Sequence, residues 1–324
     1  MSHGIALVGA RGYVGRELLS LLSGHPFLEL ALASSRELAG RAVKDLAPAL
    51  ATDLRFENLS PDDVSVRAAD AYLLALPNGK SAPWVEAIEK HRPAAILVDL
   101  SADHRFDDAW TYGLPERDRE GLRGAKRIAN PGCYATAIQL GLDPLTGLAE
   151  GPARAFGISG YSGAGTTPSP KNDPEVLRDN VLPYSLVGHV HEREVTRQLQ
   201  YPVHFLPHVA SWFRGITVTL DVSLRVRCTS EDLHARFVER YGNEPLVRVL
   251  ESAPLVRDIA GRHDVALGGM STSEDGKRVS LVATIDNLLK GAATQAIQNL
   301  NLALGLEELS GIDIEGDRPG ALLR

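Results

Sequence analysis

Cys133 is the residue of this chain best placed for covalent chemistry. It follows the turn Asn130-Pro131-Gly132 and immediately precedes an expected helix that covers residues 134 to about 147. A thiol at a helix N-terminus faces unpaired backbone N–H groups and the positive end of the helix dipole, and both favour the thiolate. Because the thiolate is the nucleophilic form, Cys133 is predicted to be a nucleophile. The alternative is a small buried core residue, as most free cysteines are.

Two histidines and a glutamate follow further along the chain, at His189, His191 and Glu194. Histidine suits general acid–base chemistry near neutral pH, so this segment is predicted to carry the proton for the thiol. The two histidines would share a face in a strand but not in a helix. The spacing also fits a zinc site or a plain surface pair, but no further cysteine or histidine cluster lies nearby, and we expect no metal.

Two other segments are suited to bind anions. Arg105 lies in residues 99–106, at the carboxyl end of an expected strand, where open α/β sheets bind their ligands. Its guanidinium can clamp a carboxylate or phosphate, unless it pairs with an aspartate of the same loop. The glycine-rich residues 159–167 follow another expected strand, and their amides can form an anion nest, unless they serve only as a hinge.

A glycine triplet lies between the first expected strand and the first expected helix, at Gly9, Gly12 and Gly15. Glycines at this place let the backbone approach a pyrophosphate that sits on the helix N-terminus. Residues 9–15 are therefore predicted to bind a dinucleotide. The alternative is a glycine-rich turn without a ligand.

The end of the second expected strand indicates which dinucleotide binds. Sheets that bind NAD usually place Asp or Glu there, to accept a hydrogen bond from the ribose 2′-hydroxyl. This chain has Ser34, Ser35 and Arg36 instead. Two hydroxyls and a guanidinium suit a 2′-phosphate, so NADP(H) is favoured over NAD(H), unless Arg36 is only a solvated loop residue.

The elements that must position these residues fall into two kinds. Buried strands are expected at four apolar runs and helices at two amphipathic stretches between them, namely strands 5–8, 28–33, 71–76 and 96–100 and helices 16–22 and 82–90. Strands that alternate with helices predict an α/β fold with a doubly wound, Rossmann-type parallel sheet.

The pattern changes after Cys133. Residues 216–226 alternate polar and apolar side chains, which is typical of a strand in an antiparallel sheet with one open face. Residues 265–272 and 278–285 are predicted to form a hairpin closed by residues 274–277. The second domain is therefore predicted to be α+β with a largely antiparallel sheet, and residues 290–306 form a closing helix.

Composition excludes several classes of protein. With 324 residues the chain is expected to form two domains, and its net charge of −7 argues against nucleic acid or an anionic membrane as the main partner. No apolar run reaches membrane-spanning length and the N-terminus carries no basic leader. Two cysteines argue against a disulfide framework, which suits a reducing compartment, and we expect a cytoplasmic protein.

Taken together, these segments resemble the N-acetyl-γ-glutamyl-phosphate reductase family, which is related to the aspartate-semialdehyde dehydrogenases. The resemblance runs nearly end to end, and its most specific part is the segment Asn130-Pro131-Gly132-Cys133-Tyr134-Ala135-Thr136. The other matching segments are residues 9–15, 34–36, 76–79, 99–106, 112–116, 159–165, 189–194, 207–208 and 286–287.

The resemblance implies an enzyme of arginine biosynthesis that reduces a small anionic acyl phosphate, N-acetyl-γ-glutamyl phosphate, to its semialdehyde with NADPH. It implies that Cys133 forms a thioester and that His189 is the acid–base. The implied substrate-binding residues are Arg105, Ser162, His191 and Glu194. The implied cofactor contacts are Gly9, Arg11, Gly12, Tyr13, Val14, Ser34, Ser35, Arg36, Leu76, Pro77, Gly163 and Asn287.

The resemblance also implies an assembly and a domain division. A homodimer or homotetramer is expected, and the closing helix is expected to rejoin the first domain. Residues 1–132 and 287–324 would then form the NADP-binding domain, and residues 133–286 the catalytic and oligomerisation domain.

The chain departs from the family pattern at three positions. Asn78 stands where the family usually has His, and Val190 and Arg193 stand where Arg and Pro are common. These departures leave the acyl chain open, so a lysine-pathway reductase acting on an aminoadipyl phosphate is an alternative. One methylene is worth only ~1–3 kcal/mol of selectivity. A cysteine hydrolase or acyltransferase without nicotinamide and a non-catalytic dinucleotide sensor are alternatives of other classes.

Overall fold

The chain forms two compact units, each with its own sheet. The computed structural model describes residues 2–314. One unit comprises the chain up to Gly132 together with Ala292–Asp313, and the other comprises Cys133–Gly291. Within the described residues, no helix combines the length and the apolar character needed to cross a membrane.

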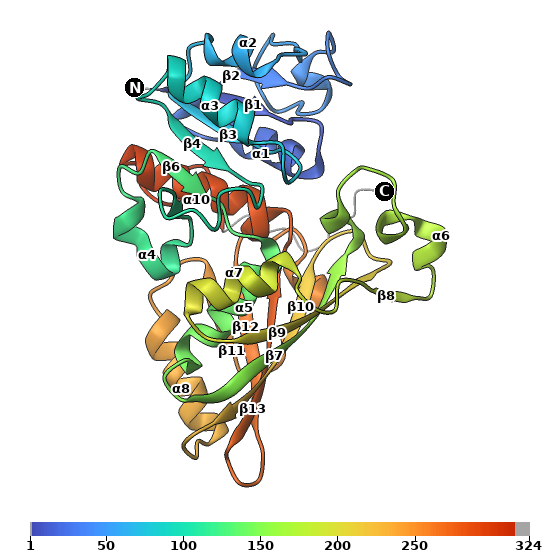
Figure 1. The fold of residues 1–324 in the computed structure, drawn as a ribbon, viewed down its shortest axis with the longest axis vertical. Coiled ribbons are helices and arrows are strands. Elements are labelled where there is room, and N and C mark those ends of the chain that lie inside the picture. Colours follow the sequence, from blue (N-terminus) through green and yellow to red (C-terminus); the bar gives the residue numbers. More distant parts are fainter. Residues whose placement is uncertain (1, 315–324) are drawn as a thin grey trace. The chain divides into compact units, whose positions relative to one another are not determined.

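Six strands form a parallel sheet in the described part of the first unit, in the order β2-β1-β3-β4-β6-β5 (Figure 1). The strands are β1 (His3–Val8), β2 (Leu28–Ser34), β3 (Ala71–Leu74), β4 (Ile96–Asp99), β5 (Thr111–Tyr112) and β6 (Arg127–Ala129). The helices are α1 (Tyr13–Ser23), α2 (Pro61–Ser65), α3 (Ala82–His91), α4 (Pro115–Leu122) and α10 (Thr294–Leu304), with a 3₁₀ turn η1 (Val43–Asp45). The Rossmann-type parallel sheet predicted from the sequence is confirmed.

Helices cover both faces of this sheet, as β1 shows. Ile5 and Leu7 belong to one buried cluster, which includes residues of α1 and α10. Ala6 and Val8 belong to a second cluster, which includes residues of α3. Because successive strand residues point to opposite faces, the apolar run of β1 supplies two cores at once. Helices therefore pack on both faces of the sheet, which is the doubly wound arrangement.

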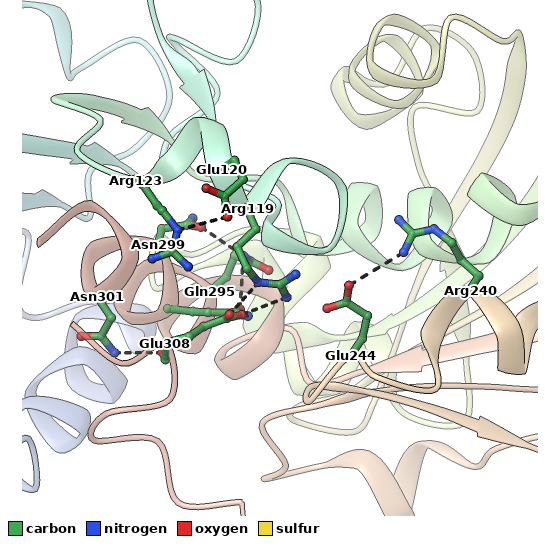
Figure 2. A network of polar contacts seen from close by, with 10 residues as sticks. Arg119, Glu120, Arg123, Arg240, Glu244, Gln295, Asn299, Asn301 and Glu308 are labelled. Carbon is green, nitrogen blue, oxygen red and sulfur yellow. Dashed lines mark hydrogen bonds and ion pairs between the residues drawn. The ribbon is translucent and has the colours of Figure 1, made fainter. Parts of the chain in front are cut away.

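Polar contacts fix α10 within the first unit (Figure 2). The Asn299 amide donates to the carbonyl of Gly113 (2.9 Å) and to the side-chain oxygen of Asn130 (3.0 Å). Arg119 pairs with Glu308, with 2.7 Å between Nε and Oε2. A Cβ at Gly113 would lie 2.2 Å from the Asn299 nitrogen, so a glycine is required there. A helix from the end of the chain thereby supports the loop that leads to the thiol.

Seven strands form a mixed sheet in the described part of the second unit, in the order β11-β12-β13-β10-β7-β9-β8. The strands are β7 (Ala149–Gly160), β8 (Val181–Pro183), β9 (Val203–Ala210), β10 (Ile216–Leu224), β11 (Val247–Leu250), β12 (Val265–Thr272) and β13 (Arg278–Ile285). The helices are α5 (Cys133–Leu142), α6 (Pro174–Leu177), α7 (Val190–Leu199), α8 (Ser230–Tyr241) and α9 (Val256–Ile259), with 3₁₀ turns η2 (Asp143–Leu145), η3 (Tyr161–Ala164) and η4 (Pro170–Asn172).

The predicted hairpin and the predicted alternating strand of this second sheet are both confirmed. β12 and β13 pair antiparallel, and β10 lies antiparallel between β13 and β7. Ile216, Val218 and Leu220 are buried, whereas Thr219 between them is exposed. Two pairs, β7 with β9 and β11 with β12, are parallel, which makes the sheet less antiparallel than expected.

The expected helix at residues 134–147 is shorter in the structure. α5 ends at Leu142, and η2 follows. Pro144 has no N–H to bond back to the carbonyl of Leu140, so it ends the helix. The hydroxyl of Tyr241 donates to that carbonyl instead, at 2.7 Å. The carbonyl that Pro144 leaves without a helical partner is therefore satisfied by a residue far away in the sequence.

The expected closing helix at 290–306 is also divided. A π-helical turn, η5 (Leu289–Ala293), precedes α10, and the N–H of Gly291 donates to the carbonyl of Asp286 five residues back. Residues 287–291 lie in the second unit rather than the first, which corrects the expected boundary. The reason is Asn287, which bonds to Ser162 and to the N–H of Gly215 in that unit.

Candidate active site

Cys133 is the first residue of α5, which begins one residue before the helix start that the sequence predicted. Its free thiol belongs to a half-buried residue. The backbone of Gly291 lies directly against it: a Cβ at Gly291 would be 2.7 Å from the Cβ of Cys133 and 3.0 Å from the carbonyl oxygen of Asp286. The π turn therefore sets the position of the thiol, and only glycine leaves room for it.

Gly291→Ala is expected to displace Cys133 and to lower kcat by about 100-fold, because a shift of about 1 Å in a reacting group costs that much. The measurement is kcat together with the rate at which iodoacetamide alkylates Cys133. Gly147→Ala is the matched control, since a Cβ there meets no atom within 4 Å. Unchanged kcat in Gly291→Ala would show that this contact does not position the thiol.

His189 and His191 come together at the start of α7. His189 is the N-cap residue, and its Nδ1 accepts a hydrogen bond from the backbone N–H of His191 (3.1 Å). The two ring centroids lie 4.9 Å apart. Because Nδ1 of the neutral His189 ring is an acceptor, its proton is on Nε2. His189 in this form is a hydrogen-bond donor at Nε2.

The surroundings of His189 keep its ring uncharged. Burial, followed by the positive charge of Lys171, lowers the pKa of His189 to about 4, while Glu192 acts in the opposite direction. Glu192 accepts hydrogen bonds from the N–H groups of Gly188 (3.0 Å) and Phe205 (2.8 Å), so it ties the histidine segment to β9. The sequence analysis predicted a role for Glu194 and did not identify Glu192, although Glu192 is also an acidic residue beside the two histidines.

Two tyrosines lie beside these groups, and the sequence reading did not single out either. The Tyr134 hydroxyl donates to the carbonyl of His208 (2.8 Å), and its ring lies 6.0 Å from that of His191. The Tyr184 ring lies 5.6 Å from that of His189. Burial and then the charge of Cys133 raise the pKa of Tyr184; for Tyr134, burial is again the largest cause of a raised pKa. Both phenols therefore stay neutral near the thiol.

The glycine-rich loop and Asn287 form a second part of the site. The Asn287 side chain donates to the hydroxyl of Ser162 (2.8 Å) and accepts from the N–H of Gly215 (2.8 Å). Ser162 is buried in η3. A Cβ at Gly163 would lie 3.0 Å from the Ser159 hydroxyl. The structure thus brings Ser162 and Gly163 together with Asn287, although Ser162 and Asn287 are 125 residues apart in the sequence.

A buried ion pair anchors the segment that carries Asn287. Arg214 binds Asp286 through two nitrogens, at 2.6 and 3.0 Å. The carboxylate of Asp286 also accepts from the N–H groups of Gly261, Leu288 and Leu289. Charge-assisted bonds of this kind are strong when the ion is fully hydrogen-bonded. Arg214 was not found from the sequence, because nothing local marks it.

Arg105 and Glu194 are both buried. Arg105 donates through Nε to the carbonyl of Asn130 (2.8 Å) and through Nη2 to the carbonyl of Leu100 (3.0 Å). Arg105 therefore holds the backbone that leads to Cys133, in addition to any contact with an anion. Glu194 lies on the packed side of α7.

The first turn of the parallel sheet is packed as a dinucleotide site requires. Gly9 has φ +87°, and a Cβ there would lie 2.2 Å from the carbonyl oxygen of Ala75. A Cβ at Gly15 would lie 2.7 Å from the carbonyl oxygen of Gly9. Gly12 is the N-cap residue of α1 and, as a glycine, makes no side-chain bond to the first amides of the helix. A helix N-terminus of this kind binds phosphate groups.

The loop after β2 contains a carboxylate that the sequence reading overlooked. β2 ends at Ser34, and the hydroxyl of Ser35 accepts from the N–H of Leu38 (3.3 Å). The Arg36 side chain is 80% exposed. Glu37 pairs with Arg36 (3.4 Å) and with Arg11 (3.3 Å). Arg11 and Arg36, the two guanidinium groups that could face a 2′-phosphate, therefore both pair with the carboxylate of Glu37.

The remaining expected cofactor residues frame the same sheet edge. Tyr13 begins α1, Val14 and Leu76 pack against buried clusters of the first unit, and Pro77 follows Leu76. Asn78 accepts from the N–H of Ala102 (3.0 Å). The unusual Asn78 therefore ties the two loops of this edge together.

Among the described residues, no group of three or more His, Cys, Asp and Glu side chains is arranged to hold a metal ion. His189, His191 and Glu194 are thus not arranged as a metal site. Within the second unit, the structure groups Cys133 and the two histidines around Tyr134 and Tyr184.

The comparisons with known proteins agree with the fold of the two units. Residues 4–125 match the NAD binding domain of semialdehyde dehydrogenase, and residues 133–287 match its dimerisation domain. Aspartate semialdehyde dehydrogenase II from Vibrio cholerae has the same fold, with a TM-score of 0.76 at 18% identity over 94% of this chain and 99% of that chain.

Curated relatives give the family. N-acetyl-gamma-glutamyl-phosphate reductase of Xanthomonas campestris pv. campestris (strain B100) is 56% identical over 95% of this chain and 98% of its own length. The protein of the same name from Stenotrophomonas maltophilia (strain R551-3) is 54% identical, over 95% of this chain and 97% of its own. The chain belongs to the N-acetyl-γ-glutamyl-phosphate reductase family.

Proposed function

We propose that this enzyme reduces N-acetyl-γ-glutamyl phosphate to its semialdehyde with NADPH, as a step of arginine biosynthesis in the cytoplasm. The observation that carries the proposal is the half-buried thiol of Cys133 at the start of α5, in a chain that is 56% identical to a named reductase. Both cysteines are free thiols, which suits a reducing compartment.

The residues of the first unit fit a nicotinamide dinucleotide. Gly9 and Gly15 allow a tight first turn in which a Cβ would collide with the backbone carbonyls of Ala75 and Gly9, and α1 has no side-chain cap at Gly12. The pyrophosphate would lie on these amides, and Ser34, Ser35 and Arg36 would hold the 2′-phosphate. Ser162, Gly163 and Asn287 are the proposed contacts for the nicotinamide and the reacting end of the substrate.

Cys133 supplies the covalent step. Its thiolate attacks the acyl carbon, a C–S bond forms, and the C–O bond to phosphate breaks with its electron pair leaving on the phosphate. When bound, the nicotinamide supplies the hydride that reduces this thioester to the aldehyde level. Cys133 then departs as a thiolate and recovers its proton from the site.

His189 supplies the proton and a hydrogen bond. With Nδ1 held by the N–H of His191, the proton on Nε2 is available to the thiolate or to the oxygen that becomes negative during reduction. A neutral imidazole with a lowered pKa is a suitable donor of this kind. Arg105, His191 and Glu194 are proposed to shape the substrate pocket around these two residues.

Arg36→Gln is expected to weaken NADPH binding by about 10- to 100-fold and to leave NADH binding unchanged, because a charged hydrogen bond is worth ~1.5–3 kcal/mol. The measurement is the Kd of each dinucleotide by titration of nicotinamide fluorescence. Glu37→Gln is the matched control: it frees Arg36 and Arg11 from their acid, so NADPH should bind at least as tightly as to wild type. Equal losses for NADPH and NADH in Arg36→Gln would contradict the proposed preference for NADP(H).

The assembly is proposed to be a homodimer or a homotetramer. The support is the match of residues 133–287 to a dimerisation domain. Sedimentation velocity of the purified chain distinguishes these two states from a monomer.

The experiment that tests the function compares acetylated, unacetylated and chain-extended acyl phosphates with NADPH and with NADH. The proposal requires that the acetylated glutamyl phosphate has the highest kcat/KM. A preference for the aminoadipyl phosphate would assign the chain to lysine biosynthesis, and phosphate release without oxidation of NADPH would indicate a cysteine hydrolase. Protection from thermal unfolding by NADPH but not by NADH gives a readout that needs no substrate.

A further inference from the structure

Lys171 presents an ammonium group beside the candidate catalytic residues. It lies half-buried in η4, and its Nζ is 4.9 Å from the centroid of the Tyr184 ring. A cation over an aromatic face is attracted by the ring, which fixes the direction of the side chain. Across residues 2–314, the structure gives this ammonium no carboxylate partner. It is therefore a cation that an anionic ligand can still neutralise.

The turn that carries Lys171 is built onto the glycine-rich loop. The amide of Asn172 donates to the carbonyls of Gly165 and Thr167, each at 2.8 Å. The side-chain oxygen of Asn172 accepts from the N–H of Ser169, also at 2.8 Å. Because these bonds involve backbone groups, the loop and the turn hold each other in one geometry. The position of Lys171 is thus set by the fold of its own segment.

Lys171 also lies close to the groups that react. The Tyr184 ring under its ammonium is 5.6 Å from the ring of His189, and the charge of Lys171 contributes to the lowered pKa of His189. Tyr184 in turn responds to the charge of Cys133. The cation therefore lies at the end of the site where the thiol acts.

We propose that Lys171 binds the phosphate group that Cys133 displaces. The inference rests on the proposed function, because it concerns the leaving group of that reaction. As the C–S bond forms, the C–O bond breaks and its electron pair leaves with the phosphate, so negative charge grows on the phosphate oxygens. A partly desolvated ammonium stabilises this charge, and lysine is a common point-charge ligand of phosphate.

The substrate also carries an α-carboxylate, but its position makes it a poor partner for Lys171. The phosphate is bonded to the carbon that the thiol attacks, whereas the α-carboxylate lies at the other end of the carbon chain. A cation beside His189 and Tyr184 is next to the reacting end.

The test uses inorganic phosphate to protect Cys133 from iodoacetamide, with alkylation followed on the Cys133 peptide by mass spectrometry. Phosphate is expected to protect the wild-type enzyme, and Lys171→Gln is expected to need about 10-fold more phosphate for the same protection. Lys171→Arg keeps the charge and should restore most of the protection. Lys277→Gln, on the exposed turn between β12 and β13, is the matched control and should behave as wild type. Equal protection in wild type and Lys171→Gln would overturn the proposal.

A kinetic readout separates the two anionic groups of the substrate. In the reverse direction, with semialdehyde, NADP⁺ and phosphate, Lys171→Gln should raise the KM for phosphate about 10-fold and leave the KM for the semialdehyde within about twofold. A rise in the semialdehyde KM alone would assign Lys171 to the α-carboxylate and overturn the proposal. If the wild-type enzyme has no reductase activity at all, the proposed function fails, while the alkylation experiment still reports on phosphate at Lys171.

Discussion

Cys133→Ser is expected to lower kcat/KM by about 10⁴-fold or more in both directions, which is the loss typical of removing a nucleophile. Serine fills nearly the same space, but its hydroxyl is not ionised near neutral pH, so it cannot form the acyl intermediate at a useful rate. The measurement is NADPH oxidation with acyl phosphate and, in reverse, phosphate-dependent reduction of NADP⁺. Binding of NADPH should be nearly unchanged, because the residues proposed to hold its pyrophosphate and 2′-phosphate belong to the first unit.

Cys228→Ser is the matched control for this substitution. Cys228 is the second free thiol of the chain and lies between β10 and α8, outside the proposed site. It should keep full activity. Activity of Cys133→Ser within tenfold of wild type would refute the covalent mechanism.

His189→Asn is expected to lower kcat by about 10²- to 10⁴-fold, the usual contribution of a positioned proton donor. Asparagine is a good N-cap residue, so it preserves the bond to the N–H of His191 while it removes the donor at Nε2. His189→Ala removes both the N-cap bond and the Nε2 donor. This variant should therefore lose a similar amount of activity and also some thermal stability. The measurements are kcat and Tm of the two variants.

The comparison of these variants separates chemistry from structure. If His189→Asn is active and only His189→Ala is impaired, His189 serves only to cap α7. If both are active and His191→Ala is dead, the two histidines exchange roles. A loss in both His189 variants, with normal Tm for the asparagine form, is the result that the proposed donor role requires.

The pH dependence of the wild-type enzyme follows from the same residue. Burial and Lys171 lower the pKa of His189 to about 4, and Glu192 opposes them. A lowered pKa means that the neutral donor persists as the pH falls through 6.5, where an ordinary histidine becomes protonated. The protonation state of His189 should therefore change only near pH 4, where a proton on Nδ1 removes the acceptor for the N–H of His191, and an NMR titration of the ring checks this directly.

The sequence predicted those parts of the fold that depend on local pattern. β10 alternates buried and exposed residues, and β12 and β13 have the bounds that their apolar pattern indicates. The sequence predicts that Cys133 lies at a helix N-terminus, because it follows the turn at Pro131 and Gly132 and precedes a helical pattern. These features need only neighbouring residues to specify them.

Other features depend on residues that are distant in the sequence, and the sequence did not reveal them. Tyr241 satisfies the Leu140 carbonyl near the end of α5, and Arg214 holds Asp286 at the start of the π turn. Lys171 and Tyr184 meet only because Asn172 fixes the intervening turn on the glycine-rich loop. Tertiary contacts of this kind leave no periodic signal.

Two sequence interpretations of polar residues need refinement for the same reason. Arg105 was expected to clamp an anion, and in the structure it donates to the carbonyls of Asn130 and Leu100. Arg36 is predicted to bind a 2′-phosphate, and in the structure Glu37 pairs with it. In both cases the partner is a backbone group or a neighbour whose orientation a sequence pattern does not specify.

The central claim is that Cys133 carries the acyl group during turnover, and mass spectrometry of the enzyme tests it most directly. The enzyme is mixed with N-acetyl-γ-glutamyl phosphate in the absence of NADPH, quenched in acid and digested. The account predicts release of about one phosphate per active site and an N-acetylglutamyl adduct on the peptide that contains Cys133. No adduct, or an adduct on a residue other than Cys133, would contradict the account.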